Sequence, residues 1–325
     1  MNFIYDALEE NPAVQILVFT TKNTTTFQTP TFPNTTIYRF GKVSSNALTR
    51  YSSYIYFNLL SSFILLFRKV DFITAFESLS IFPLWLVKKV QPDAKAHIHF
   101  HEYLSNPERQ ASSAYMKFLF KLEDQLLMKF SCSQTNEDRK RLFLVDKPFV
   151  NPERVEVRPN MPPKYWWNKF GQFKNPSIDN KIRLVAVGAC DNHTMYVKEV
   201  LDWVSANQDS LELTIISQEI PQETKDLILS YHCPAIHIIP PIDYYQLPQE
   251  LMKYDVGLVL YKGVNSNHIF SVPNKVHEYL ACGLGVIVDY KLTTTVNLKN
   301  ESILVLELSR INEYLVSNLK SRLEK

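Results

Sequence analysis

Three polar side chains near residue 275 have the types and the spacing of a phosphate and sugar site. In the segment SVPNKVHEYLACGLGVIVDY (residues 271–290), Asn274, Lys275 and Glu278 are one to four residues apart. A helix capped by Ser271 therefore presents them together on its exposed side, near its positive end. Free N–H groups at a helix N-terminus bind a diphosphate, and a carboxylate one turn further on can accept both hydroxyl groups of a ribose. The alternative interpretation is an ordinary Lys–Glu pair on a solvated helix face.

The elements around this helix place it where ligands bind in α/β proteins. Pro273 suits the first turn of the helix, and Gly283 is a stop signal before the apolar run of residues 285–290. The preceding loop, residues 261–275, is polar and follows another apolar run at residues 256–262. Because parallel sheets bind ligands beyond the carboxyl ends of their strands, we expect this loop and the helix to border a ligand.

The whole chain alternates short apolar runs with longer amphipathic segments, which is typical of parallel α/β layers. A chain of 325 residues is longer than one hydrophobic core usually supports. Two Rossmann-like domains in tandem are therefore expected, with a ligand cleft where they meet. We predict the first domain at residues 1–160, a proline-rich linker at 161–180, the second domain at 181–308 and a terminal helix at 309–325 that packs back on the first domain. The predicted strands are residues 14–21, 35–40, 71–77, 96–102, 129–134, 182–189, 211–217, 235–242, 256–262, 285–290 and 302–307.

Composition excludes several classes of protein. The four cysteines are scattered, without the spacing of a zinc site or a disulfide framework, and this favours a reducing, cytoplasmic setting. The acidic start MNFIYDALEENP is unlike a signal peptide, and the most apolar run, residues 54–67, is shorter than the roughly 20 residues that cross a bilayer. The sequence has no stripe of basic residues interleaved with aromatic ones, so nucleic-acid binding is not predicted. Residues 1–160 hold 19 Lys and Arg against 15 Asp and Glu, which is compatible either with scatter or with peripheral association with the inner face of an anionic membrane.

The segment DVGLVLYKGVNSNHIFSVPNKVHEYLACGLGVIV resembles the donor-binding segment of glycosyltransferases with the GT-B fold, especially the family-4-like group. That pattern is a buried D-hydrophobic-G strand, a loop and then PxKxxEYLAxGxPVI. Other segments resemble the family in the same order: VDFITAFE and AHIHFHE in the first domain, RVEVRPNMP at the entry to the second, and IRLVAVGACDNH at its opening strand and glycine turn.

The resemblance assigns roles to individual residues. Glu278 would hold the donor ribose, with Lys275 and Asn274 near the diphosphate or sugar, and the backbone amides from Ser271 onward would contact phosphate. Gly188 would form the glycine turn beneath the donor. The other residues given donor or catalytic roles are Lys198, His101 and Glu102.

His101, with Glu102 as second choice, is the catalytic candidate of the first domain. It ends the strand that also holds His97 and His99, so the three imidazoles share one face. A histidine at the strand's end could hydrogen-bond a sugar hydroxyl or orient the acceptor. The alternatives are imidazoles satisfied by packing and, less in keeping with this fold, a metal site.

Two departures from the family pattern affect these assignments. Many relatives have a first glutamate separated from the second by seven residues, the E-x7-E motif, but the residue at that position before Glu278 is Phe270, so the partner carboxylate is missing. Relatives also begin with a strand and a glycine-rich loop, whereas this chain opens on a helix-like segment and has no glycine before Gly41. The first domain is therefore expected to be reduced at its N-terminus.

The resemblance implies a retaining hexosyltransferase that needs no metal ion or other cofactor. It would move a sugar from a nucleotide-sugar donor to a hydroxyl of a glycan or lipid-linked acceptor, in the synthesis of a cell-surface polysaccharide. Two alternatives stay open: a non-catalytic glycosyltransferase-like subunit that binds sugars or scaffolds a complex, and a nucleotide-sugar epimerase.

Overall fold

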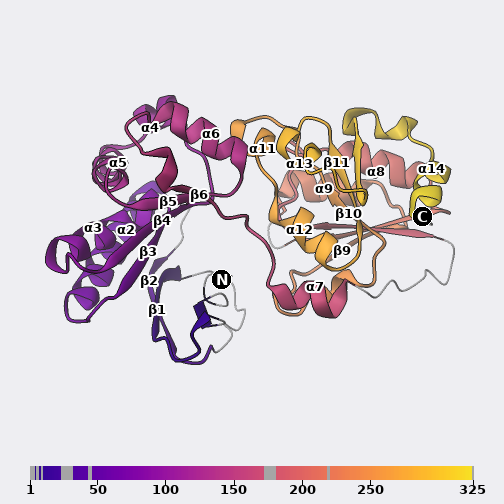
Figure 1. Ribbon diagram of the computed structural model, residues 1–325. Helices are drawn as coiled ribbons and strands as arrows, with labels where there is room; N and C mark the ends of the chain where they lie inside the picture. Colours follow the sequence, from indigo (N-terminus) through magenta and orange to yellow (C-terminus); the bar gives the residue numbers. More distant parts are fainter. Residues whose placement is uncertain are drawn as a thin grey trace. The chain divides into compact units, whose positions relative to one another are not determined.

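The structure is a computed structural model that describes residues 4, 7, 8, 10–22, 32–42, 46–171, 181–217 and 220–323 (Figure 1). The chain divides into two compact units, Met1–Pro159 and Asn160–Lys325. Each unit is an α/β unit with parallel strands, as the alternating sequence pattern predicts. The predicted opening helix lies largely outside the described residues.

The described part of the first unit has two separate parallel sheets. Strands β1 (Ile16–Lys22) and β2 (Thr35–Lys42) pair with each other, and a four-stranded sheet has the order β3-β4-β5-β6. The four strands are β3 (Phe72–Phe76), β4 (Lys95–Phe100), β5 (Ser131–Gln134) and β6 (Val155–Val157). Sequence analysis did not predict β6, because three residues are too few for a periodic pattern.

The helices of the first unit cover these sheets. The apolar core lies between the four-stranded sheet and α3 and α5, with Ile98, Leu84 and Leu119 fully buried. The helical segments are α2 (Ala47–Leu66), a 3₁₀ turn at Ser78–Ser80, α3 (Ile81–Val90), α4 (Asn106–Ala111), α5 (Ala114–Leu127), α6 (Glu137–Asp146) and a 3₁₀ turn at Pro152–Arg154.

The second unit is built on a six-stranded parallel sheet, counted over the described residues, with the order β12-β11-β10-β7-β8-β9. The chain first runs outward from β7 through β8 and β9, and then returns to β10 on the other side of β7. The point between β7 and β10 is therefore a topological switch point, where ligands bind in open α/β sheets. The strands are β7 (Ile182–Val187), β8 (Leu211–Ile216), β9 (Ile236–Ile239), β10 (Val256–Val259), β11 (Gly285–Asp289) and β12 (Ile303–Leu306).

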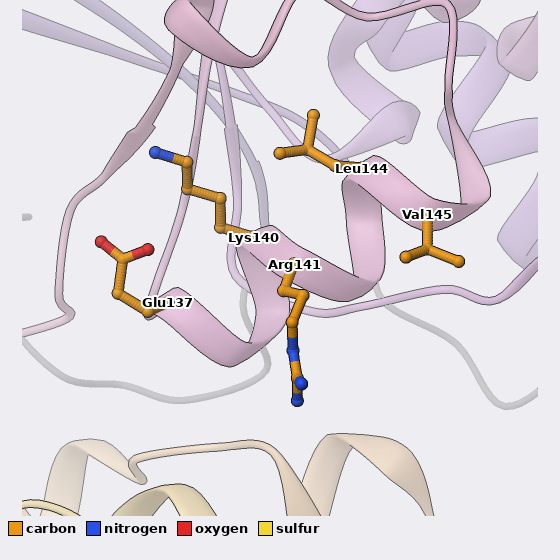
Figure 2. A pocket seen from close by; sticks show the side chains of 5 residues that line it. All are labelled: Glu137, Lys140, Arg141, Leu144 and Val145. Atoms are coloured by element: carbon orange, nitrogen blue, oxygen red, sulfur yellow. The ribbon is translucent and has the colours of Figure 1, made fainter.

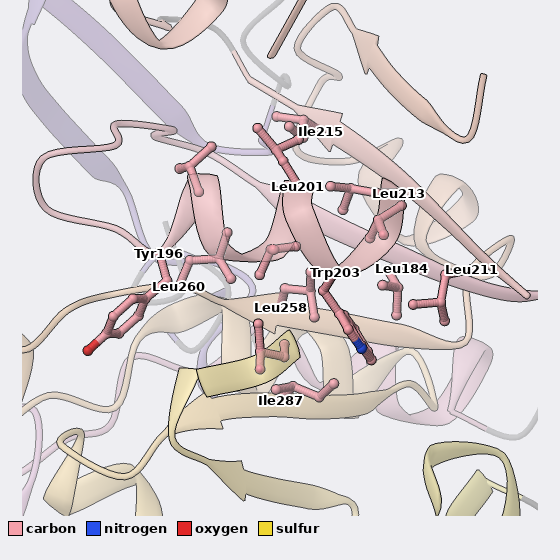
Figure 3. Packing of buried hydrophobic residues seen from close by; sticks show 14 of the residues in the cluster. Leu184, Tyr196, Leu201, Trp203, Leu211, Leu213, Ile215, Leu258, Leu260 and Ile287 are labelled. Atoms are coloured by element: carbon pink, nitrogen blue, oxygen red, sulfur yellow. The ribbon is translucent and has the colours of Figure 1, made fainter. Parts of the chain in front are cut away.

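Helices cover both faces of this sheet and give the unit two apolar layers. Figure 3 shows one layer, in which Trp203 of α8 packs against the sheet beside Leu201 and Leu258. The other layer holds Trp166 and Tyr279, both fully buried. The helical segments are α7 (Lys164–Phe170), α8 (Val197–Ala206), α9 (Gln222–Ser230), α10 (Leu247–Leu251), α11 (Ser266–Ile269), α12 (Asn274–Ala281), α13 (Thr293–Val296), a 3₁₀ segment at Leu308–Glu313 and α14 (Val316–Leu323).

Two predicted segments differ from the structure. The described part of the predicted linker contains α7, because Trp166 and Phe170 recur at the spacing of one helical turn and both enter the core of the second unit. The predicted terminal helix at residues 309–325 is a 3₁₀ segment at Leu308–Glu313 followed by α14, and Leu319 of α14 is buried in the core of the second unit. Arg322 also donates hydrogen bonds to the carbonyls of Glu301 and Ile303 in that unit. That the terminal helix also packs on the first domain stays a prediction.

Candidate functional site

Helix α12 begins at the carboxyl end of β10 without a capping side chain. Its first residue is Asn274 and its N-cap is Pro273, which has no side-chain hydrogen bond to offer. The prediction that Ser271 caps the helix is wrong, because the Ser271 hydroxyl donates to the carbonyl of His268 instead, at 3.1 Å. No capping side chain of the described residues therefore binds the first amides of α12. These amides form the positive end of the helix dipole.

Helix α12 is locked to the sheet at both ends of the EYLACG stretch. The ring of Tyr279 lies flat on Gly257 of β10, where a Cβ would come within 2.1 Å of the Tyr279 Cδ2 atom. The Tyr279 hydroxyl accepts a hydrogen bond from the Val187 amide at 3.0 Å, which ties the helix to β7 as well. Gly283, at φ +77°, ends the helix: the amides of Gly283 and Leu284 return to the carbonyls of Leu280 and Tyr279, as in a Schellman motif.

Glu278 is a buried carboxylate beside the switch point. Its side chain was expected on an exposed helix face, but the residue is only 8% exposed and hydrogen-bonds to the hydroxyl of Tyr244. Burial raises the pKa of Glu278 to about 7, although Lys275 and the Tyr244 hydroxyl act in the opposite direction. The Tyr244 ring in turn packs on Trp166 with ring centroids 5.0 Å apart. Above about pH 7 Glu278 is therefore a carboxylate that can accept hydrogen bonds, held beside the aromatic rings of Tyr244 and Trp166.

Lys275 and Gly188 lie against each other across the switch point. Gly188 follows β7 with φ +95°, and a Cβ there would lie 3.0 Å from Lys275 Cε and 3.1 Å from Lys275 Nζ. The Lys275 ammonium also lies 5.3 Å from the centre of the Tyr261 ring. A glycine at the turn after β7 therefore leaves room for the Lys275 side chain above it, and places a cation near the start of α12.

The remaining donor candidates lie apart from this cluster. Lys198 is on the exposed side of α8 and pairs with Asp202 at 2.7 Å, one turn further along the same helix. Asn274 is exposed to solvent at the helix start. The structure thus brings together Glu278, Lys275 and Gly188, whereas Lys198 already has its counter-charge on its own helix.

Two further lysines extend the positive charge along the same sheet edge: Lys262, which the sequence offered as a phosphate-neutralising candidate, and Lys291, which sequence analysis did not assign to the site. Lys262 follows β10 and Lys291 follows β11, and each ammonium lies 5.7 Å from the centre of the buried Tyr196 ring. Lys262 donates to the carbonyl of Asn192 at 2.7 Å, and Lys291 bonds to the Tyr196 hydroxyl at 2.9 Å. The signal that could have identified Lys291 is its position directly after a buried parallel strand.

In the first unit, His97 and His99 serve packing. The two ring nitrogens of His97 lie 3.0 and 2.8 Å from the hydroxyls of Ser131 and Ser133 on β5, and His99 Nδ1 lies 2.7 Å from Ser133. Burial, followed by the neighbouring His101, lowers the pKa of His99 to about 3. These two histidines are therefore neutral and satisfied within the sheet, which is the packing alternative.

His101 follows β4 and is only partly buried. Its ring stacks on Phe76 at 5.9 Å and meets the edge of His99 at 4.5 Å. Burial is the first cause that lowers its pKa, so the imidazole is neutral near pH 7 and can donate one hydrogen bond and accept another. Glu102, the second choice, is exposed.

Glu77 holds the turn that contains His101, and sequence analysis missed it. One carboxylate oxygen, Oε1, accepts hydrogen bonds from the amides of His101 and Glu102, while Arg139 donates to the His101 carbonyl. Glu77 adopts φ +60°, a conformation that costs a non-glycine residue on the order of 1–3 kcal/mol. Burial raises its pKa to about 7. The available signal was a charged residue at the carboxyl end of a buried strand.

A separate hollow of about 390 Å³ lies on α6 of the first unit. Figure 2 shows its lining, which contains none of the predicted site residues: Glu137, Lys140, Arg141, Leu144 and Val145. The hollow is open, and all of its lining residues, polar and apolar, come from one face of α6. It is therefore not an enclosed binding site.

No family model matches the sequence, and no curated protein matches it. Solved structures do resemble the fold. Sucrose-phosphate synthase from Thermosynechococcus elongatus has a TM-score of 0.66 at 14% identity, covering 98% of this chain and 83% of that one. An α,α-trehalose-phosphate synthase (UDP-forming) from Burkholderia vietnamiensis has a TM-score of 0.63 at 11% identity, covering 99% and 87%. The Anabaena protein HepE, in complex with UDP and glucose, has a TM-score of 0.59 at 10% identity, covering 89% and 79%.

These likenesses define the architecture. The chain has the GT-B fold of glycosyltransferases, with two parallel α/β units in tandem. The resemblance to this fold class that was drawn from the sequence is confirmed.

Proposed function

We propose that the protein is a glycosyltransferase that moves a sugar from a nucleotide-diphosphate donor to a hydroxyl of a glycan or lipid-linked acceptor. The observation that carries the proposal is the cluster at the switch point of the second sheet: a buried carboxylate, a lysine above a glycine turn, and an uncapped helix start. The GT-B fold supports it, because HepE has been solved with UDP and glucose.

Each group of the cluster has a role that follows from its chemistry. Glu278, as an acceptor with one partner in Tyr244, takes the hydroxyls of the donor ribose. Lys275 and the first amides of α12 bind the diphosphate. Their positive charge stabilises the diphosphate as the bond between it and the sugar's anomeric carbon breaks.

The acceptor hydroxyl forms the new bond to the anomeric carbon and loses its proton to the departing diphosphate. Because the departing diphosphate takes this proton, the reaction needs no general base from the protein. We assign it retention of the configuration at the anomeric carbon. We assign His101 a hydrogen bond to a sugar or acceptor hydroxyl, which its neutral imidazole can make at pH 7. With Lys275, Lys262 and Lys291 supplying positive charge, transfer is expected to proceed in the presence of EDTA.

The test is transfer from uridine, guanosine, cytidine and thymidine diphosphate sugars to acceptors, with wild type and Glu278→Ala. The proposal predicts turnover with one base, which the variant loses while its circular dichroism spectrum stays unchanged. Equal turnover in the variant would remove Glu278 from the site.

A second candidate is a non-catalytic subunit that binds a nucleotide sugar. It is favoured by the absence of the family's first glutamate directly after α11, where the chain has Phe270. Selective donor binding without transfer would support this subunit. Interconversion of the donor sugar in the absence of acceptor would instead identify the third candidate, an epimerase.

A further inference from the structure

Helix α2 exposes large apolar side chains along one face. Each of these residues is between 37% and 82% exposed, and together we call them the outer face of α2: Leu48, Ile55, Tyr56, Leu59, Phe63, Leu66 and Phe67. At 100° per residue they occupy one stripe about 120° wide along the helix. A helix whose outer side meets water carries charged or polar residues there, so this stripe predicts an apolar environment.

The buried side of α2 is polar instead. Ser53, Asn58, Ser61 and Ser62 are each at most 8% exposed. Asn58 donates to the hydroxyl of Tyr115, whereas the hydroxyls of Ser61 and Ser62 have no hydrogen-bond partner among the described residues. The polarity of the helix is therefore inverted relative to a helix at a water interface. Packing inside the unit does not explain where the large side chains lie.

Helices α3 and α5 of the same unit carry further aromatic side chains that are partly or fully exposed. Helix α3 packs beside α2 (Figure 1), and its Phe82 stacks on Trp85 with ring centroids 6.0 Å apart. Phe82 also contacts Phe118 of α5 at 6.4 Å, and Phe118 is 46% exposed. Aromatic rings at the surface are the residues that insert at the level of lipid headgroups.

Charge identifies the partner. Residues 11–70 contain no Asp or Glu, and they contain six basic residues, of which Arg50 lies in α2 and Arg68 and Lys69 directly follow it. Lys89, in the last turn of α3, lies over the Trp85 ring at 5.6 Å. Lys69 also lies 3.7 Å from the carboxylate of the exposed Asp71, which leaves Arg50, Arg68 and Lys89 as the other basic residues nearby. An apolar stripe with an excess of basic residues at its ends complements anionic headgroups above acyl chains.

The same charges disfavour the alternative of a second copy of this chain. A two-fold interface brings the same patch of both subunits together, so the basic residues beside α2 would face each other. An anionic bilayer attracts them instead. Within the described residues, no helix is both long enough and apolar enough to cross a membrane, so contact through α2 places the helix on the surface.

We propose that the outer face of α2 docks on an anionic lipid bilayer, with the helix parallel to the surface, its apolar side chains among the upper acyl chains and the flanking basic residues at the headgroups. This docking is independent of sugar transfer and stands or falls separately from the proposed function.

The experiment is vesicle flotation of the full chain with phosphatidylcholine alone and with phosphatidylcholine containing phosphatidylglycerol. Wild type is expected to float with the mixed vesicles, and less so as salt is raised, because surface attraction is screened. Leu59→Gln combined with Phe63→Gln should lower the partition coefficient at least about tenfold, since two buried apolar side chains leave the bilayer.

The matched control is Leu229→Gln combined with Leu298→Gln, which changes two exposed leucines of the second unit and should leave flotation unchanged. A second variant, Arg68→Glu with Lys69→Glu, keeps the apolar stripe and should lose only the preference for anionic vesicles. These substitutions are all at the surface, and circular dichroism checks the fold of each.

Failure of wild type to float with anionic vesicles at low salt would overturn the proposal, and so would equal flotation of the Leu59/Phe63 variant. Light scattering gives the third adverse outcome. A wild-type dimer that the same variant converts to monomer would show that α2 is an interface between copies of the chain.

Discussion

Replacing the buried carboxylate with its neutral isostere, Glu278→Gln, should stabilise the protein at high pH while it weakens the proposed donor site. Burial raises the pKa of Glu278 from 4.5 to about 7, which corresponds to roughly 3 kcal/mol. The direction of this pKa shift decides at which pH the ionised side chain lowers the stability of the folded state. Below about pH 4.5 the carboxyl is protonated in both the folded and the unfolded states, and it costs nothing. As pH rises through 7 the folded state must ionise a buried group, so the full cost is present above that value.

Glutamine keeps the oxygen that bonds to the Tyr244 hydroxyl but cannot ionise. For a unit of this size, 1 kcal/mol changes Tm by roughly 2–4 °C, so Glu278→Gln should melt roughly 6–12 °C above wild type at pH 8. At pH 4.5 the two should melt together. The assay is differential scanning calorimetry of both proteins from pH 4.5 to 8.5.

The control is Glu301→Gln, the same chemical change at an exposed position of the second unit, which should shift Tm little at any pH. A Glu278→Gln variant that melts at or below the wild-type temperature at pH 8 would refute the reasoning. It would mean that the carboxylate is stabilised by its surroundings rather than strained by burial.

Three further predictions test other parts of the account. Gly257→Ala should cost roughly 3 kcal/mol by urea unfolding, because its Cβ would meet a buried tyrosine ring at 2.1 Å; Gly285→Ala, whose nearest neighbour is a flexible side-chain end at 3.2 Å, should cost less than about 1 kcal/mol. Lys275→Ala should weaken nucleoside diphosphate binding by about tenfold or more in calorimetric titration, whereas Lys198→Ala should leave it within about twofold; equal effects would contradict the placement. Glu77→Ala should lower the transfer rate and leave donor affinity unchanged, because it frees the amides that hold the turn of the first unit; a change confined to donor affinity would count against that role.

Much of the fold was accessible from the sequence because most strands, those of the second unit above all, are short apolar runs bounded by polar residues. Every predicted strand in the second unit appears in the structure, and Gly283 ends α12 as predicted. The core that the terminal helix joins was not accessible from the sequence, because an amphipathic pattern indicates that one face of a helix is buried but not what covers that face. Only the structure shows that Leu319 enters the second core.

The site was harder to predict than the fold. The spacing of Lys275 and Glu278 predicted that both lie on one helix, as they do in α12, but it suggested an exposed pair, since helical periodicity carries no information on the loop that covers a side chain. Tyr244, which covers Glu278, lies 34 residues earlier in the chain, so no local pattern connects the two. The same holds for Glu77, which follows β3 and whose carboxylate accepts from the amide of Glu102 after the neighbouring strand β4, 25 residues later.

The most direct test of the central claim is thermal stabilisation by a panel of uridine, guanosine, cytidine and thymidine diphosphates, with wild type and Glu278→Ala in parallel. At a ligand concentration about 100 times Kd, binding adds about 2.7 kcal/mol to stability, which is a Tm increase of roughly 5–10 °C. The account predicts such an increase with one base, abolished in the variant. No increase with any nucleotide, or the same increase in the variant, would contradict it.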